Sequence, residues 1–128
     1  MSVPRHVALI ALACALASGL ALAGCGTGPR PSTATVQDCG TGLTAANVPV
    51  EIEVDRGQVT CSAAMQVEAG YAKAIVHGQA PGNGGGGPVR VDGWTCQGLP
   101  TPQLLKTGET SKCAKDGHEI VAILRSAG

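Results

Sequence analysis

The chain contains no phenylalanine, one tryptophan (Trp94) and one tyrosine (Tyr71), so aromatic residues make up only 2% of it. Large aromatic side chains usually supply much of the buried apolar area of a domain. Their near absence predicts a core of small aliphatic side chains, which is thin for about 90 ordered residues. Covalent cross-links are therefore expected to contribute to the stability of the fold.

The chain also lacks a Cys-x-x-Cys pair, although it has six cysteines. Structural zinc sites and thioredoxin-like redox sites both use such closely spaced cysteines, so neither is expected. His77 and His118 have no spacing typical of metal ligands, and Ser62 and Ser111 lack a Gly-x-Ser-x-Gly setting. We therefore expect no metal, no cofactor and no enzymatic activity.

Lysine and arginine are few and scattered. The chain has nine basic and nine acidic residues and no net charge. Nucleic-acid binding requires clustered basic side chains that neutralise phosphates. Nucleic acid is therefore not an expected partner.

Residues 1–24 have the three parts of an export signal. A short basic segment contains Arg5 and His6, an uncharged apolar segment follows over residues 7–23, and small residues come next. The 17 apolar residues are fewer than the roughly 20 that a membrane-spanning helix needs. The alternatives are an ordinary secretory signal cut near Ala23 and an uncleaved anchor.

The last three residues of this region and the cysteine that follows them, Leu22-Ala23-Gly24-Cys25, resemble the bacterial lipobox at every position. The resemblance implies that the Cys25 sulfur receives a diacylglyceryl group and that a signal peptidase cleaves between Gly24 and Cys25. Two acyl chains, each gaining about 0.8 kcal/mol per buried methylene, anchor a protein without a spanning helix. The expected location is the extracytoplasmic face of the cell membrane, where the lipid makes the membrane itself a partner.

The rest of the chain is long enough for one domain. Removal of 24 of the 128 residues leaves 104. Residues 25–37 are rich in Pro, Gly, Ser and Thr, which predicts a lipidated flexible tether with a reach on the order of 20 Å. Residues 38–128 are expected to form a single extracytoplasmic domain.

The first half of this domain predicts a strand and a helix. Apolar residues alternate over 48–54, which is typical of a half-buried strand, and Pro49 places that strand at an edge or marks its first residues. Residues 60–77 lack proline and are rich in good helix formers. They predict a helix of about four turns with Thr60 as its N-cap.

The second half predicts three more strands, at 89–96, 109–115 and 118–125. Asp116-Gly117 is a signal for a two-residue hairpin between the last two strands. Residues 120–124 are apolar on both faces, so the last strand is expected to be central. The predicted fold class is α+β, with one helix packed on a small antiparallel sheet of about four strands.

Four cysteines remain after Cys25 and the Cys14 of the export signal. An even number in an oxidising compartment predicts two disulfides, with three possible pairings. The order of the elements favours Cys39 with Cys61 and Cys96 with Cys113. Each bond would close a loop of about 20 residues and contribute roughly 3 kcal/mol.

Glu68 is the one polar residue near the centre of the predicted apolar face of the helix. The favoured interpretation is that its carboxylate reaches the rim of the interface or pairs with Lys73 or an arginine. The alternative is a buried functional acid. The apolar face itself comprises Cys61, Ala64, Met65, Ala72, Ile75 and Val76, with Tyr71 on its flank.

Trp94 is the one candidate binding residue. Gly93 is expected to form a bulge in the strand 89–96, because Val91 and Trp94 would otherwise face opposite sides. Beside Cys96, the indole is expected to cap the core; the alternative is an exposed platform for a glycan or a peptide.

Residues 78–88 contain six glycines. They follow a predicted helix and lack the Gly-Lys-Ser/Thr ending of a phosphate-binding loop, so they are expected to form a flexible connector. Tolerance of insertions is favoured over a role in binding.

Three short motifs resemble a broad group of small actinobacterial envelope lipoproteins and secreted proteins. They are Val-Thr-Cys-Ser-Ala-Ala at 59–64, Gly-Trp-Thr-Cys at 93–96, and Cys113. The resemblance covers residues 39–124 and implies a cysteine-bearing helix packed on a small antiparallel sheet. It implies no particular activity and no catalytic residue.

Two hypotheses about function follow. The first is a membrane-tethered interaction module that binds an envelope protein or a wall polymer through a flat surface patch of several hundred Å². The alternative is a small inhibitor or solute-binding domain that uses the Gly-rich loop or a cleft around Trp94. That alternative predicts a concave pocket of roughly 300 Å³ or more with converging polar groups. An enzyme would need Glu68 and a histidine in one cleft.

Overall fold

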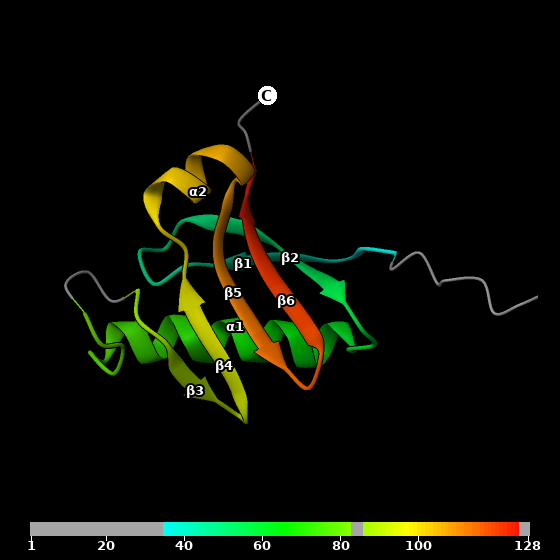
Figure 1. Ribbon diagram of the computed structural model, residues 1–128, viewed down its shortest axis with the longest axis horizontal. Helices are drawn as coiled ribbons and strands as arrows, with labels where there is room; N and C mark the ends of the chain where they lie inside the picture. The colour runs from blue at the N-terminus through cyan, green and yellow to red at the C-terminus, as the bar shows by residue number, and fades with distance from the viewer. Residues whose placement is uncertain (1–34, 83–85, 126–128) are drawn as a thin grey trace, which may run out of the picture. The chain divides into compact units, whose positions relative to one another are not determined.

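The computed structural model describes residues 35–82 and 86–125 (Figure 1). The predicted signal peptide, the lipid site Cys25 with its cleavage site after Gly24, and most of the tether lie outside these residues. No helix in the described part is long and apolar enough to cross a membrane. The described elements are β1 (Gln37–Leu43), β2 (Pro49–Arg56), α1 (Cys61–Val76), β3 (Val89–Val91), β4 (Trp94–Gly98), α2 (Thr101–Thr107), β5 (Glu109–Lys115) and β6 (His118–Leu124).

The strands form one antiparallel sheet in the order β1-β2-β6-β5-β4-β3. The β1–β2 hairpin forms one side of the sheet and the β3–β4 hairpin the other. α1 connects these two hairpins by crossing one face of the sheet, and α2 lies at one end of it (Figure 1). The predicted α+β class is confirmed, but the sheet has six strands where about four were expected.

One additional strand is β1, which precedes the first predicted strand. It pairs with β2 and is interrupted by an irregularity between Asp38 and Thr41. β2 therefore lies between β1 and β6 and is not an edge strand; Pro49 is simply its first residue. The sequence of β1 contains two glycines and one large aliphatic residue, so no period-2 apolar pattern indicated it.

The other additional strand comes from a turn at Asp92-Gly93. The prediction of one bulged strand over 89–96 is wrong, because this dipeptide joins two strands, β3 and β4. Its φ angles of 48° and 83° are both positive, as a tight two-residue hairpin requires. The hairpin pairs Val91 with Trp94, so these two side chains share a face without any bulge.

α1 forms as predicted, and the hydroxyl of Thr60 accepts a hydrogen bond from the Ala63 backbone N–H at its start. The buried stripe of the helix is rotated relative to the predicted one. Tyr71 lies in the core and not on the flank, whereas Val76 is exposed. The buried residues of α1 are Ala64, Val67, Glu68, Tyr71 and Ala74.

This stripe packs against the inward residues of the sheet, chiefly Val50, Ile52 and Val54 of β2 and Ile120 and Ala122 of β6. The central position of β6 is confirmed. On its other face Val121 is only 2% exposed, although among the described residues no helix covers it. The strand register places it between Glu53 and Lys112, whose long side chains lie on either side of it.

α2 was not predicted. It has seven residues, with Pro102 in its first turn, and it ends at Gly108, whose φ is 78°. Such a short helix carries too few turns for an apolar period to stand out.

Both predicted disulfides are confirmed. The bond between Cys39 and Cys61 connects β1 to the first residue of α1. Cys96 and Cys113 are directly opposite each other on β4 and β5, and both are fully buried. The two bonds thus connect the helix and one hairpin to the rest of a core that is poor in aromatic residues.

Candidate functional site

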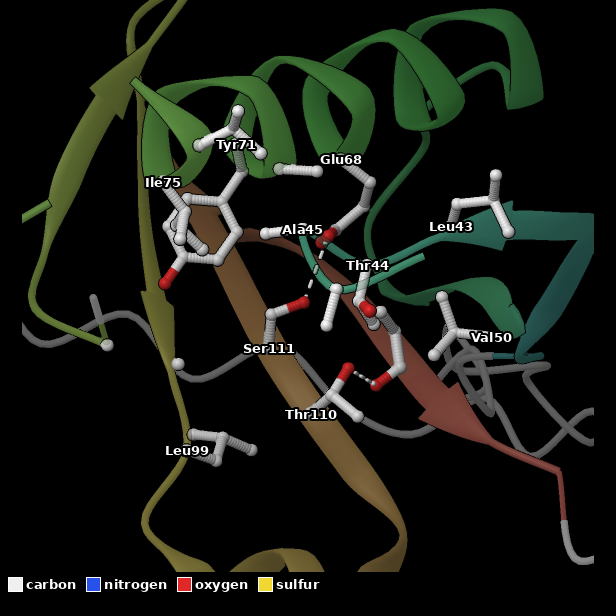
Figure 2. Close-up of a pocket in the computed structure, with 16 residues that line it drawn as sticks. Leu43, Thr44, Ala45, Val50, Glu68, Tyr71, Ile75, Leu99, Thr110 and Ser111 are labelled. Carbon is white, nitrogen blue, oxygen red and sulfur yellow. Dashed lines mark hydrogen bonds between the residues drawn. The ribbon is translucent and has the colours of Figure 1, made fainter. Parts of the chain in front are cut away.

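A cavity of about 500 Å³ lies between the second half of α1 and the sheet (Figure 2). The turn between β1 and β2 closes one side of it, and the ends of β4 and β5 close the other. Most of the wall is aliphatic. The lining residues from α1 are Glu68, Tyr71, Ala72, Ile75 and Val76; those from the turn are Leu43, Thr44, Ala45 and Ala46; those from the sheet and its ends include Val50, Gly98, Leu99, Thr110, Ser111 and Ala122.

Helical spacing brings the polar groups of α1 into this cavity. Glu68 and Tyr71 are three residues apart, so both lie on the face of α1 that packs against the sheet. Opposite them, Ser111 points inward from β5 and pairs across the sheet with Ala122. Small side chains at these two positions leave room between helix and sheet.

Glu68 and Ser111 form the polar centre of the cavity. The Ser111 hydroxyl donates a hydrogen bond of 2.9 Å to Oε2 of Glu68 (Figure 2). Glu68 is 7% exposed, and its other oxygen, Oε1, has no hydrogen-bond partner among the described residues. The interpretation that Glu68 reaches the rim, or pairs with Lys73 or an arginine, is therefore wrong.

Burial raises the pKa of Glu68 from its ordinary value of 4.5 to about 7, and the hydrogen bond from Ser111 opposes that shift. The lining residues that the structure describes contain no second acid and no lysine, arginine or histidine. The ionised carboxylate thus has a donor in Ser111 but no counter-ion. Near neutral pH both protonation states of Glu68 are populated.

Tyr71 is the second polar group with an unfilled hydrogen-bonding position. Its ring is buried, and within the described part of the chain its hydroxyl has no hydrogen-bond partner. Burial raises the pKa of Tyr71 and the nearby Glu68 carboxyl raises it further, whereas the adjacent backbone of Gly98 opposes the shift. Buried polar atoms normally have partners, and each one left unsatisfied costs about 1–3 kcal/mol. These two atoms are therefore in position to bind a polar group that enters the cavity.

The other hydroxyls around the cavity already have partners. Thr110 donates to the carbonyl of Ala122, and Thr44 accepts from the backbone N–H of Val48. The mouth is apolar, because Leu43 and Val76 are 56% and 65% exposed.

Most of the features singled out from the sequence lie elsewhere. Trp94 is 7% exposed and belongs to the core, as the favoured interpretation expected, and it does not line the cavity. Within the described part of the Gly-rich segment, Gly86 lines the cavity and accepts a hydrogen bond from Gly98. His77 and His118 do not contribute to the lining, so Glu68 shares this cleft with no histidine of the described chain.

The site therefore centres on Glu68, which the sequence singled out, and on Ser111 and Tyr71, which the sequence did not connect with Glu68. Glu68 was the polar residue on an apolar helix face, and that signal was informative. Nothing in the sequence paired it with Ser111, which is 43 residues away. No cluster of three or more potential metal ligands occurs in residues 35–82 and 86–125.

A comparison with known protein families, curated proteins and solved structures finds no significant match. The functional argument therefore depends on the chemistry and geometry of this cavity.

Proposed function

We propose that this domain binds a small, mainly apolar ligand in the cavity between α1 and the sheet. The observation that carries the proposal is an aliphatic cavity of about 500 Å³ that encloses two buried polar atoms without partners, Glu68 Oε1 and the Tyr71 hydroxyl. Ligand sites are typically apolar hollows of roughly 300–1,000 Å³ with a few polar groups that orient the ligand. This cavity has both properties.

The proposed site does not lie where the solute-binding hypothesis drawn from the sequence placed it. That hypothesis used Trp94 or the Gly-rich loop, whereas the proposed site is built mainly from α1, β5 and the turn between β1 and β2, and the Gly-rich segment contributes only Gly86 among the described residues. Lipidation at Cys25 is part of the proposal, because a lipid anchor and a short tether would hold this binding domain at the extracytoplasmic face of the membrane.

An interaction module that binds an envelope protein or a wall polymer is the second candidate. It is supported by two exposed aliphatic residues that line the cavity, Leu43 and Val76, and by the exposed Val48 in the turn between β1 and β2. A partner that covers these residues would bury apolar surface without filling the cavity. Filling the cavity artificially therefore distinguishes the two functions.

The test is the substitution Ala72→Phe, which adds a ring at a half-buried position of the cavity wall. The full chain in lipid nanodiscs would be titrated with benzyl alcohol and followed by NMR chemical shifts. We expect shifts at lining residues of the wild type, and binding at least about tenfold weaker in Ala72→Phe because the ring occupies the ligand volume.

Ala69→Phe is the matched control, since Ala69 is exposed on the same helix and does not line the cavity. It should bind benzyl alcohol like the wild type, and empty nanodiscs correct for partitioning of the probe. Equal binding by the two phenylalanine variants, or no shifts at the cavity in the wild type, would contradict the proposal.

A further inference from the structure

We infer that the natural ligand of this cavity is an amine, an apolar group carrying an ammonium that pairs with the Glu68 carboxylate. The inference rests on the proposed function and specifies its ligand class. It follows from the charges, the hydrogen-bond donors and the burial around Glu68.

The charge of the cavity has one sign. Glu68 is the only charged side chain among the lining residues that the structure describes, and no cation faces it. An anionic ligand would therefore meet a buried like charge, which is unfavourable. A cationic ligand would meet a carboxylate that has no other counter-ion.

The hydrogen bonds around Glu68 favour an accepting carboxylate. Ser111 already donates to Oε2, and Oε1 keeps free lone pairs. An ammonium has only donors, so it can bond Oε1 without competing with the Ser111 hydroxyl, which occupies Oε2. The buried carboxylate oxygen that lacks a partner would then be satisfied by the ligand.

Burial makes this pairing selective. A buried charge is costly when it is alone, and a hydrogen-bonded opposite charge offsets that cost. The aliphatic wall around Glu68 supplies the apolar surroundings in which an ion pair is strong. An alcohol of the same shape could make the hydrogen bonds but could not supply the counter-charge.

Glu68 alone should set the pH dependence of binding near neutrality. The groups facing it are Tyr71 on its own helix, Ser111 and Thr110 on β5, Thr44 in the β1–β2 turn, and apolar side chains of β2 and β6. None of these changes its charge between about pH 6 and pH 8. A primary alkylamine stays protonated over the same range.

The experiment compares three probes of matched shape, benzylamine, benzyl alcohol and benzoate, on the full chain in nanodiscs at about pH 6 and pH 8. At the higher pH we expect benzylamine to bind at least about tenfold more tightly than benzyl alcohol, and benzoate not to bind. Because Glu68 has a pKa of about 7, benzylamine affinity should rise roughly tenfold from the lower to the higher pH.

Glu68→Gln should remove both the preference for the amine and its pH dependence. Glu53→Gln is the control, because it removes a negative charge on the other face of the sheet and should keep both. Benzyl alcohol binding with no preference for benzylamine would overturn the amine inference and leave the proposed function intact. Failure of all three probes to bind would overturn both, and tighter binding of benzoate would overturn the amine inference.

Discussion

At the scale of single residues, Glu68 combines a structural cost with a binding role. The domain buries a carboxyl group and gives it one neutral donor, Ser111, without a counter-ion among the described lining residues. Such an arrangement is unfavourable for folding alone. A residue of this kind is expected where a ligand supplies the missing partner.

The pH dependence of stability tests this account of Glu68. The pKa is about 7 in the folded chain against 4.5 ordinarily, so the folded state binds more protons between these values. The contribution of Glu68 to stability is therefore full below about pH 4.5 and falls by about 3 kcal/mol as the pH rises through 7. In Glu68→Gln the free energy of unfolding should not decrease in this way, and the variant should be more stable than the wild type above pH 7. Urea unfolding across the pH range measures both effects.

Glu53→Gln again serves as the control, since it removes one acidic group without touching the cavity. Its unfolding free energy should follow the wild-type pH curve. If Glu68→Gln also follows that curve, the carboxyl group is not buried as described.

At the scale of elements, the turn between β2 and α1 depends on a glycine. Gly57 has a φ of 83°, and a Cβ added there would lie 1.9 Å from Nδ1 of His118. Gly57→Ala is thus expected to lower the free energy of unfolding by about 1–3 kcal/mol from backbone strain, with a further loss from the clash. Urea unfolding measures both contributions together.

Gly117 allows the two contributions to be separated. Its φ of 80° is almost the same, but a Cβ there meets nothing within 4 Å. Gly117→Ala should show the strain alone, and the double variant Gly57→Ala with His118→Ala should recover part of the additional loss. Equal losses in Gly57→Ala and Gly117→Ala would show that His118 does not limit this turn.

At the scale of the whole molecule, the predicted anchor decides where the cavity is presented. Mass spectrometry of the protein from cells should find Cys25 as the N-terminal residue, with a diacylglyceryl group on its sulfur. Cys25→Ser should abolish both the lipid and the cleavage after Gly24, because serine lacks the nucleophilic sulfur. Cys14→Ser is the matched control and should change neither, and an unmodified Cys25 in the wild type would refute the anchor.

Features that depend on neighbouring residues could be predicted from the sequence. The N-cap at Thr60, the helix after it and the Asp116-Gly117 hairpin each depend on local backbone preferences. The same hairpin signal occurs at Asp92-Gly93, and there it forms a turn in place of the expected bulge. β1 and α2 carry no comparable signal. Their own residues have weak preferences for these conformations, and the two elements are stabilised by pairing and packing with other parts of the chain.

The candidate site, like the fold, could be predicted from the sequence only in part. The position of Glu68 on an apolar helix face indicated an unusual residue, and the pairing of four cysteines followed from the order of the elements. Neither observation could show a cavity. The volume of the cavity depends on how α1, the turn between β1 and β2, and β5 pack together. A pattern within one short stretch of sequence cannot predict that packing.

The sequence by itself therefore determined the α+β class, the main helix, the disulfides and the central last strand, because each follows from short-range periodicity, turn chemistry or chain order. Only the tertiary structure decided between the two interpretations of Trp94, as a core residue, and showed that the hydrogen-bond donor to the buried Glu68 carboxyl is Ser111. The reason is that burial and pKa depend on atoms brought together from distant parts of the chain. The proposed binding site arises from that long-range packing.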